Sequence, residues 1–307
     1  MIEILLATYN GEKYLSKQLD SLLGQSYSDF HIFIRDDGSS DGTVSVINDY
    51  VTKNPDKITF IHDNKLCKSP MKNFMALLEY ATADYVMFCD QDDYWYREKI
   101  VHTYNEMKSV EKDSSIPTLV FTNYKVVNEN LEPMKVNEKN LYTYKKRLNL
   151  SPLLVQNVVT GCTMMINKAL YKNLTETRED IIMHDWWCAL YASSFGMIKY
   201  LPEKTLYYRQ HPGNSEGAID LSNPKYYFKH QTIKKAKTSM KRYLGQANAF
   251  LEIFGPSLEQ YDYEKYQILK RFADLKNKNK LVRMYTILRY HHTKSNFLLT
   301  ILQLWFC

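Results

Sequence analysis

Residues 88–95 read FCDQDDYW, so three carboxylates, those of Asp90, Asp92 and Asp93, follow directly after a run of hydrophobic residues. Like charges at this spacing repel one another, and a stable fold gathers them only beside a cation, a proton or a strongly polar ligand. Carboxylate oxygens suit a hard divalent cation such as Mg²⁺ or Mn²⁺, which can bridge phosphates. The competing interpretation is an acidic surface turn without a ligand. Trp95 weighs against it, because an aromatic ring beside the cluster favours the floor of a pocket.

A second polar motif, RDDGSSDGT at residues 35–43, also follows an apolar run. Asp, Ser and Gly are ordinary turn formers, so a tight turn between a strand and a helix is the competing interpretation. Beside the other motifs, however, an Asp at a strand tip can accept a hydrogen bond from the N–H of a pyrimidine base. Tyr9, at the tip of the preceding apolar run, could stack on that base.

Two motifs in the second half of the chain add candidates for proton transfer and metal binding. In HDWW, Asp185 falls in the first turn of an expected helix, where the helix dipole keeps a carboxylate ionised. An ionised carboxylate in this position could act as a general base. A plain helix-terminal acid is the alternative. In YRQHPGN, the Pro-Gly pair makes a loop rather than a core position, so a neutral His211 could complete a metal site. Arg209 or Arg97 could face phosphate.

The hydrophobic pattern places these motifs on an α/β fold. Short apolar runs alternate with helical patterns in a βαβαβαβ order, which indicates a parallel sheet with crossover helices. Ligands bind such sheets beyond the carboxyl ends of the strands. Three polar stretches fall at such ends, namely residues 8–10, the RDDGSSDGT motif and the acidic part of FCDQDDYW. From about residue 222 the pattern becomes helical. The expected strands are residues 2–9, 30–37, 57–63, 85–90, 118–127, 158–167 and the stretch from 204, and a helix is expected over 184–195.

Composition indicates the size of the domain, the distribution of charge and the expected cellular compartment. The 307 residues suffice for one large α/β domain with a helical extension, and the charge of +6 is concentrated from Lys225 to Lys294, where basic residues outnumber acidic ones by about three to one. The 25 tyrosines suit carbohydrate contact or a membrane interface. The five cysteines form no C-x-x-C pair, and no export signal is visible at the start, so a reducing cytoplasm is expected. The apolar stretch 296–307 is too short to cross a membrane.

Taken together, the ordered motifs resemble the inverting family 2 glycosyltransferases of the GT-A fold. The resemblance covers residues 1–217, and no G-x-G-x-x-G follows the first strand, which disfavours a dehydrogenase. The DQDDYW form is similar to that of bacterial rhamnosyltransferases that build cell-surface polysaccharides. The motifs that carry the resemblance are ATYNGEKYLSKQLDSLLGQSY, IRDDGSSDGT, FCDQDDYW, TGCTMMIN, HDWW and YRQHPGN.

The resemblance implies a role for each site residue. Asp92 would be the principal metal ligand of the D-x-D motif and His211 the second, with Mn²⁺ or Mg²⁺ as the ion. Asp185 would be the catalytic base, although many relatives have Glu where this chain has His184. The residues implied for the nucleotide sugar are Ala7, Thr8, Tyr9, Asp36, Asp37, Lys72, Asp90, Gln91, Asp92 and Arg209. The residues implied for the acceptor and sugar pocket are Asp93, Trp95, Gly161, His184, Trp186 and Trp187.

The implied activity is metal-dependent transfer of a sugar from a nucleotide sugar, foremost dTDP-L-rhamnose, to a growing bacterial surface polysaccharide that is lipid-linked. Open alternatives are UDP-glucose, UDP-galactose or a UDP-N-acetylhexosamine as donor, and an inactive nucleotide- or sugar-binding module. Residues 1–220 would form the GT-A domain and residues 221–307 a basic, aromatic-rich helical region. This region suits docking on an anionic membrane on the cytoplasmic side or dimerisation, whereas no recognised nucleic-acid module accompanies it.

Overall fold

The structure is a computed structural model that describes all of the chain except residues 64, 135–146, 175, 213–229 and 296. The expected boundary between residues 220 and 221 lies outside the described residues, as do the last two residues of the YRQHPGN motif. Within the described residues, the chain forms two compact units. The first consists of Met1–Lys135, Val159–Thr177 and Ile198–Ala218. The second consists of Val136–Val158, Arg178–Met197 and Ile219–Cys307.

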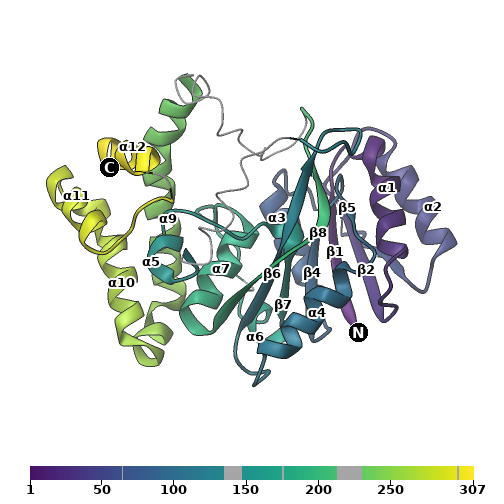
Figure 1. The fold of residues 1–307 in the computed structure, drawn as a ribbon, viewed down its shortest axis with the longest axis horizontal. Coiled ribbons are helices and arrows are strands. Elements are labelled where there is room, and N and C mark those ends of the chain that lie inside the picture. The colour runs from purple at the N-terminus through teal and green to yellow at the C-terminus, as the bar shows by residue number, and fades with distance from the viewer. Residues whose placement is uncertain (64, 135–146, 175, 213–229, 296) are drawn as a thin grey trace. The chain divides into compact units, whose positions relative to one another are not determined.

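The first unit is built on one eight-stranded mixed sheet with the order β3-β2-β1-β4-β7-β6-β8-β5 (Figure 1). The strands β1 to β4 pair in parallel, as the alternating sequence pattern predicts, and β7 pairs antiparallel with both β4 and β6. The strands are β1 (Ile2–Thr8), β2 (Phe30–Asp36), β3 (Ile58–Phe60), β4 (Tyr85–Asp90), β5 (Tyr94–Trp95), β6 (Thr118–Val127), β7 (Met164–Asn167) and β8 (Met197–Arg209).

The central strands are buried on both faces. Five consecutive residues of β1, Ile2 to Leu6, have almost no exposed surface, and all but the last residue of β4 is buried. A strand covered on both faces reads as a continuous apolar run, which is why β1 and β4 could be found in the sequence. The one acid inside β1, Glu3, is tolerated because both of its carboxylate oxygens accept hydrogen bonds from Thr82.

Helices complete the first unit and set the directions of the loops at the strand tips. Gly11 precedes α1, and a Cβ there would lie 2.2 Å from Oε1 of Gln91, so the glycine leaves room for that amide. Helices α1 and α2 contact each other, and α3 contacts β1 and β2. The helices are α1 (Glu12–Leu23), α2 (Thr43–Lys53), α3 (Pro70–Leu78), α4 (Lys99–Val110), α6 (Lys168–Tyr171) and the 3-10 helix η3 (Gly161–Thr163).

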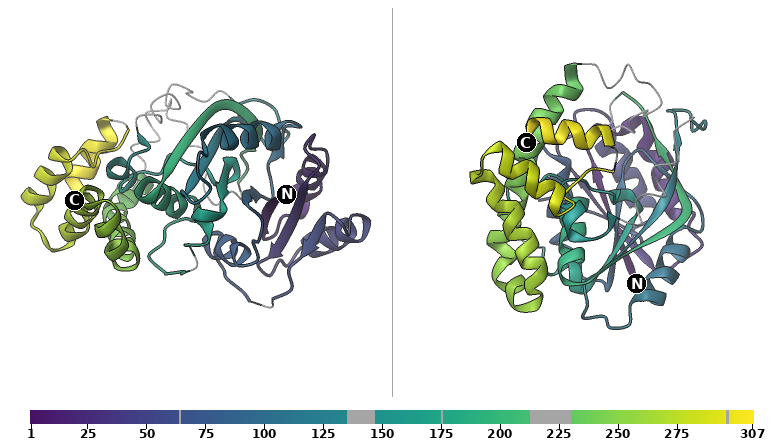
Figure 2. Two further views of the ribbon diagram at one scale, coloured as in Figure 1. Left: turned by 90° about the horizontal axis from the view of Figure 1, so that it is seen from below. Right: turned by 60° about the vertical axis from the view of Figure 1, so that its left-hand side comes forward.

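The second unit is helical, and its C-terminal helices pack on one another (Figure 2). Helix α9 contacts α7, α10 and α12, and α5 contacts α7 and α10. Among the residues that the structure describes, no helix is long and apolar enough to span a bilayer. The helices are α5 (Leu150–Leu153), α7 (His184–Phe195), α9 (His230–Tyr261), α10 (Tyr263–Ala273), η4 (Asp274–Asn277), α11 (Lys280–Arg289) and α12 (Phe297–Phe306).

The compact units divide the chain differently from the expected domains. The described residues 147–158 and the segment 178–197 belong with the C-terminal helices rather than with the sheet, so Asp185 is part of the second unit. The expected helical nature of the chain beyond residue 222 holds for the described residues, which form α9 to α12.

Candidate active site

The tips of β1, β2 and β4 lie at one edge of the sheet. They bring together residues 8–10, the RDDGSSDGT motif and the acidic motif. Thr8 is paired with Asp36 in the β1–β2 register, and Ala7 is paired with Asp90 in the β1–β4 register. The alignment expected from the sequence is therefore present, because parallel neighbours end on the same side.

Asp36 closes the turn that follows β2. Its Oδ1 accepts hydrogen bonds from Oγ1 of Thr8 at 2.8 Å and Oγ of Ser39 at 2.6 Å, while Oδ2 accepts from the backbone N–H groups of Gly38 and Ser39. Gly38 has a φ of 85°, a left-handed conformation that glycine adopts without strain. Asp36 thus shapes the loop beside the expected nucleoside position.

Asp37 is almost fully buried and organises the loop before α3. Its carboxylate accepts hydrogen bonds from the backbone N–H groups of Cys67 and Ser69. The guanidinium of Arg35, which has no exposed surface, lies 3.7 Å from Asp37 and makes two hydrogen bonds with Asp63, at 2.8 and 3.0 Å. The Arg35 cation balances both acids, and Arg35 and Asp37 together hold residues 65–69 beside the strand tip.

Gln91 clamps the tip of β1. Its Oε1 accepts a hydrogen bond from the backbone N–H of Tyr9 at 2.8 Å, and its Nε2 donates to the carbonyl oxygen of Tyr9 at 2.9 Å. The Tyr9 side chain is exposed. The middle residue of the D-x-D motif therefore binds the backbone of Tyr9, and stacking of the Tyr9 ring on a base stays a prediction.

Lys72 lies in the first turn of α3, beside Asn73. The side-chain amide of Asn73 accepts a hydrogen bond from Arg35 at 2.8 Å and donates to the carbonyl oxygens of Thr8 and Arg35, both at 3.4 Å. These hydrogen bonds hold the start of α3 against the tips of β1 and β2. Lys72 lies in the same turn of α3.

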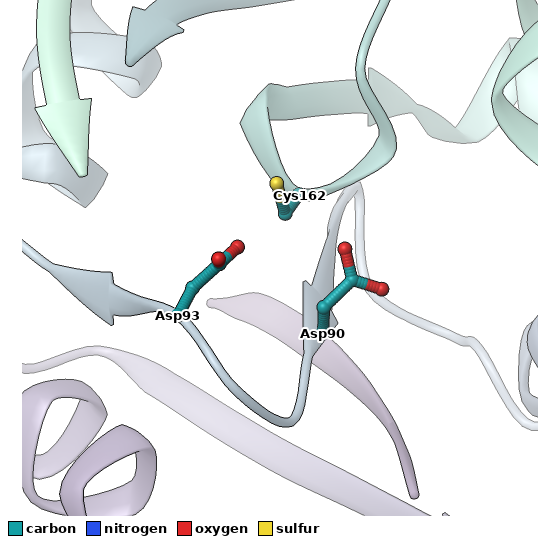
Figure 3. A group of neighbouring side chains, drawn as sticks. All are labelled: Asp90, Asp93 and Cys162. Carbon is teal, nitrogen blue, oxygen red and sulfur yellow. The ribbon is translucent and has the colours of Figure 1, made fainter. Parts of the chain in front are cut away.

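Asp93, Asp90 and Cys162 form a cluster at the base of the acidic motif (Figure 3). Potential ligand atoms of the three residues lie within 4.8 Å of one another, and Asp93 and Cys162 are buried. Burial, reinforced by the charges of Asp92 and Asp90, raises the pKa of Asp93 well above its ordinary value. Burial likewise raises the pKa of the Cys162 thiol. The protonated form of Asp93 is favoured, which relieves the repulsion that the sequence predicts.

Asp92 and His211 lie in direct contact. Nε2 of His211 is 2.8 Å from Oδ2 of Asp92, and both side chains retain a little exposure, 11% and 13%. Adjacent corners of an octahedral ion with ligand distances near 2.1 Å are about 3 Å apart. This spacing, together with the chemistry of one imidazole and one carboxylate, fits a shared Mn²⁺ or Mg²⁺ with the oxygen ligands of a diphosphate. The two residues could hold such an ion with little movement.

Tyr14 supports His211 from α1. The two ring centroids are 4.5 Å apart with an angle of 34° between the planes. The guanidinium carbon of Arg209 lies 4.7 Å from the centre of the Tyr14 ring, and Lys13, next to Tyr14, forms an ion pair with Glu129. No sequence motif predicts a role for Tyr14 or Glu129. Their positions relative to His211 depend on pairing of distant segments, which residue spacing does not reveal.

Arg209 is buried and joins the β8 end to the acidic motif. Its backbone N–H donates to Oδ1 of Asp93 at 3.1 Å, its Nε donates to the carbonyl oxygen of Asp92 at 2.5 Å, and its Nη1 donates to the carbonyl oxygen of Glu129 at 2.6 Å. These bonds fix the position of the chain two residues before His211. A contact between Arg209 and phosphate stays a prediction.

Two residues expected near the sugar lie in the interior of the first unit. Trp95 is part of the hydrophobic core, and Nζ of the buried Lys99 lies 4.6 Å from the centre of its ring. Burial lowers the pKa of Lys99 to about 8. Gly161 begins η3 and is buried next to Cys162. Trp95 and Gly161 are therefore both buried in the first unit. Their contact with a sugar stays a prediction.

The HDWW residues belong to the second unit, at the start of α7. Oδ1 of Asp185 accepts a hydrogen bond from the backbone N–H of Trp186 at 2.6 Å. Nε1 of Trp186 donates to the carbonyl oxygen of Leu153, and Trp187 is fully buried against Phe250. The tryptophans therefore anchor α7, whose first turn carries Asp185.

His184 is buried next to the expected base. Burial lowers its pKa to about 3, so the ring is neutral at neutral pH. Asp185 therefore has no charged neighbour at position 184.

Comparison with known proteins identifies the family. The Glycosyl transferase family 2 profile matches residues 3–174, which is more than half of the chain. The dTDP-rhamnosyl transferase RfbG of Shigella flexneri is 30% identical over 233 residues, covering 72% of this chain and 76% of its own length. The chain belongs to glycosyl transferase family 2. It spans 52% of the length of two further relatives, uncharacterised glycosyltransferases from Rickettsia.

Solved structures show the same fold. The crystal structure of S. aureus TarS 1-349 in complex with UDP-GlcNAc has a TM-score of 0.55 and 17% identity, covering 94% of this chain and 87% of that one. The mannosyltransferase PcManGT from Pyrobaculum calidifontis, in complex with GDP-Man and Mn²⁺, has a TM-score of 0.55 and 14% identity, covering 99% and 87%. The fold is the GT-A fold with C-terminal helices, as the resemblance implies.

Proposed function

We propose that this glycosyltransferase is metal-dependent and inverting, and that it transfers L-rhamnose from dTDP-L-rhamnose to a hydroxyl of a bacterial surface polysaccharide. The observation that carries the proposal is the preformed pair of Asp92 and His211, which fits a divalent ion beside the aligned strand tips. The preference for rhamnose is supported by the 30% identical relative that is named a dTDP-rhamnosyl transferase.

The residues of the first unit would hold the donor. Asp37 and Thr8 lie at the strand tips where the nucleoside is expected, and the exposed Tyr9 ring offers a surface for the base. Asp92 and His211 would hold Mn²⁺ or Mg²⁺, and a bound divalent ion neutralises the negative charge that develops on a departing diphosphate. Lys72, carried on the first turn of α3, would approach the diphosphate.

Asp185 would act as the general base. It would remove the proton from the attacking hydroxyl of the acceptor, while the new bond forms at the anomeric carbon on the face opposite the phosphate. One displacement of this kind inverts the configuration. The first-turn position of Asp185 on α7 favours the ionised form that a base requires.

A second donor class has support of its own. TarS carries UDP-GlcNAc in its crystal structure and shares the fold, which keeps UDP-N-acetylhexosamines, UDP-glucose and UDP-galactose as candidate donors. The acceptor would be a lipid-linked glycan, which places the reaction at the cytoplasmic face of a membrane.

Thermal denaturation with a panel of nucleotide sugars tests the donor. The protein would be melted with dTDP-L-rhamnose, UDP-glucose, UDP-galactose and UDP-N-acetylglucosamine, each with and without Mn²⁺. We expect the largest rise in melting temperature with dTDP-L-rhamnose and Mn²⁺ together, because a ligand that binds only the folded state stabilises it. A larger shift with a UDP-sugar would assign the donor to the alternative class.

A further inference from the structure

Two neighbouring C-terminal helices expose a continuous set of large apolar side chains. On α11, Leu281, Tyr285 and Leu288 recur at spacings of four and three, so they lie on one side of the helix, and all three are exposed. On α12, Ile301 and Trp305 are four residues apart and also exposed. We call these five residues the α11–α12 face.

A contact between the helices brings the start of α11 next to the end of α12. Nζ of Lys280, at the start of α11, donates a hydrogen bond to the carbonyl oxygen of Trp305 at 2.8 Å and lies 5.2 Å from the centre of its ring. Leu281, which is 79% exposed, is the next residue, and Trp305 is 68% exposed. The buried contacts of α11 lie elsewhere on the helix, at Ile287.

The segment that carries this face is basic and has no acidic residue. Residues 275–307 contain no Asp or Glu, and their basic side chains are Lys276, Lys278, Lys280, Arg283, Arg289 and Lys294. The side chains of Lys276, Lys278, Lys280 and Arg289 are exposed. An exposed apolar set of this kind marks an interaction surface, and the charge selects an anionic partner.

We infer that the α11–α12 face docks on the surface of an anionic lipid bilayer. A cationic helix pair with Trp, Tyr and Leu on its exposed side can insert these side chains at the boundary of the headgroups and acyl chains, while Lys and Arg contact lipid phosphates. A second copy packed through the same face would bring the cations of residues 275–307 against one another, since this segment has no Asp or Glu. Nucleic acid would satisfy the charge but leave Leu281 and Ile301 in water.

The inference rests on the proposed function and assigns the contact with the membrane to the α11–α12 face. It uses none of the residues of the candidate active site. Its test requires no turnover, so docking and sugar transfer can fail independently. Trp305 offers a direct probe, because the other three tryptophans, at positions 95, 186 and 187, are buried.

The experiment is co-sedimentation of the whole protein with vesicles of phosphatidylcholine containing increasing phosphatidylglycerol, combined with tryptophan fluorescence. We expect binding that rises with phosphatidylglycerol and falls with added salt, and a blue shift of emission that is lost in Trp305→Ser. Leu281→Ser/Tyr285→Ser should abolish binding, and Lys276→Glu/Lys278→Glu should weaken it by roughly fivefold or more per cation changed.

Lys17→Glu/Lys53→Glu is the matched control, since it makes the same charge change on exposed lysines of α1 and α2 in the first unit. Unchanged binding by this control supports the inference. It would be overturned by absence of sedimentation with anionic vesicles, by equal binding to pure phosphatidylcholine, or by equal weakening in the control. It would also be overturned if the protein ignored vesicles and formed a dimer that Leu281→Ser/Tyr285→Ser converts to a monomer.

Discussion

Nε2 of His211 lies 2.8 Å from Oδ2 of Asp92, although the two residues are 119 positions apart in the sequence. The contact depends on Arg209, whose backbone N–H and side chain bond Asp93 and the carbonyl oxygen of Asp92. The end of β8 is therefore fixed against the acidic motif before any ligand arrives. A preformed pair of this kind lowers the cost of ordering the site when an ion and a diphosphate bind.

Removal of either member of this pair should abolish turnover without unfolding the protein. We expect Asp92→Asn and His211→Ala each to reduce the release of dTDP from dTDP-L-rhamnose by about 100-fold or more, because the ion loses one of its two protein ligands. Turnover would be measured with purified protein in Mn²⁺, after treatment with a chelator as a reference for the metal-free rate.

His102→Ala is the matched control for His211→Ala. His102 is a partly exposed histidine in an ion pair with Glu203 at 2.8 Å, so its loss removes a His–acid contact in the first unit at another place. Its turnover should stay within about twofold of the wild-type value, as expected for a surface substitution. Full activity of His211→Ala in the same assay would rule out the assigned metal ligand.

Tyr14 should act as a positioning residue for His211. Tyr14→Ala removes the ring that packs on His211 and Arg209, and we expect the affinity for Mn²⁺ to fall by roughly 10- to 100-fold. Tyr14→Phe retains the ring and loses the hydroxyl, which makes a long hydrogen bond of 3.4 Å to Glu129 and interacts with Lys13, so its affinity should be close to that of the wild type. Equal Mn²⁺ affinity in all three proteins, measured by titration calorimetry, would show that the ring contact does not matter.

Asp93 should tolerate a neutral isostere better than an apolar residue. Burial favours its protonated form, and Asn has the same shape and can still accept the hydrogen bond from the Arg209 N–H. We therefore expect Asp93→Leu to lose about 1–3 kcal/mol more unfolding free energy than Asp93→Asn, since Leu leaves a buried N–H without its acceptor. Urea unfolding at neutral pH measures the difference, and an Asn variant less stable than the Leu variant would contradict the assignment.

His184 should make the second unit sensitive to acid. Its pKa is about 3 in the folded chain and near 6.5 when unfolded, so between these values the unfolded state binds more protons and stability falls as the pH falls. The loss approaches about 1.4 kcal/mol per pH unit within that window. His184→Gln should show a shallower decline of unfolding free energy from pH 6.5 to 4, whereas His62→Gln, at an exposed position, should follow the wild type.

Substitution of Asp185 tests whether the protein is an enzyme or an inactive binding module. Asp185→Asn should reduce transfer by about 10²- to 10⁴-fold, the usual contribution of a general base, and should leave the affinity for dTDP unchanged. Product formation and dTDP binding would be measured on the same preparation. Transfer at the wild-type rate by Asp185→Asn would remove this residue from the mechanism.

The parallel strands could be predicted from the sequence because both of their faces are buried. Strands β1, β2 and β4 begin and end within about two residues of the expected ranges, and α7 has the expected bounds. The prediction over 158–167 was wrong in its first half, where η3 precedes a four-residue β7. Strand β8 begins at Met197 rather than at residue 204, since its exposed lysines and glutamate break the apolar pattern.

The parts of the site that the sequence did not reveal depend on contacts between distant segments. Arg35 stands within a motif that was found, yet nothing in its spacing shows that it binds Asp63 and Asp37 from a fully buried position. Cys162 was given no role in the site from the sequence, because its place beside Asp93 depends on the chain reaching η3. Two-residue strands such as β5, which pairs with β8, carry too few residues for a pattern to appear.

The most direct test of the central claim is pulsed electron paramagnetic resonance of Mn²⁺ bound together with dTDP. Coordination by His211 predicts modulation of the Mn²⁺ echo by a directly bound ¹⁴N nucleus in the wild type, loss of that modulation in His211→Ala, and weak or absent Mn²⁺ binding in Asp92→Asn. The same nitrogen modulation in His211→Ala, or wild-type Mn²⁺ affinity in Asp92→Asn, would contradict the account.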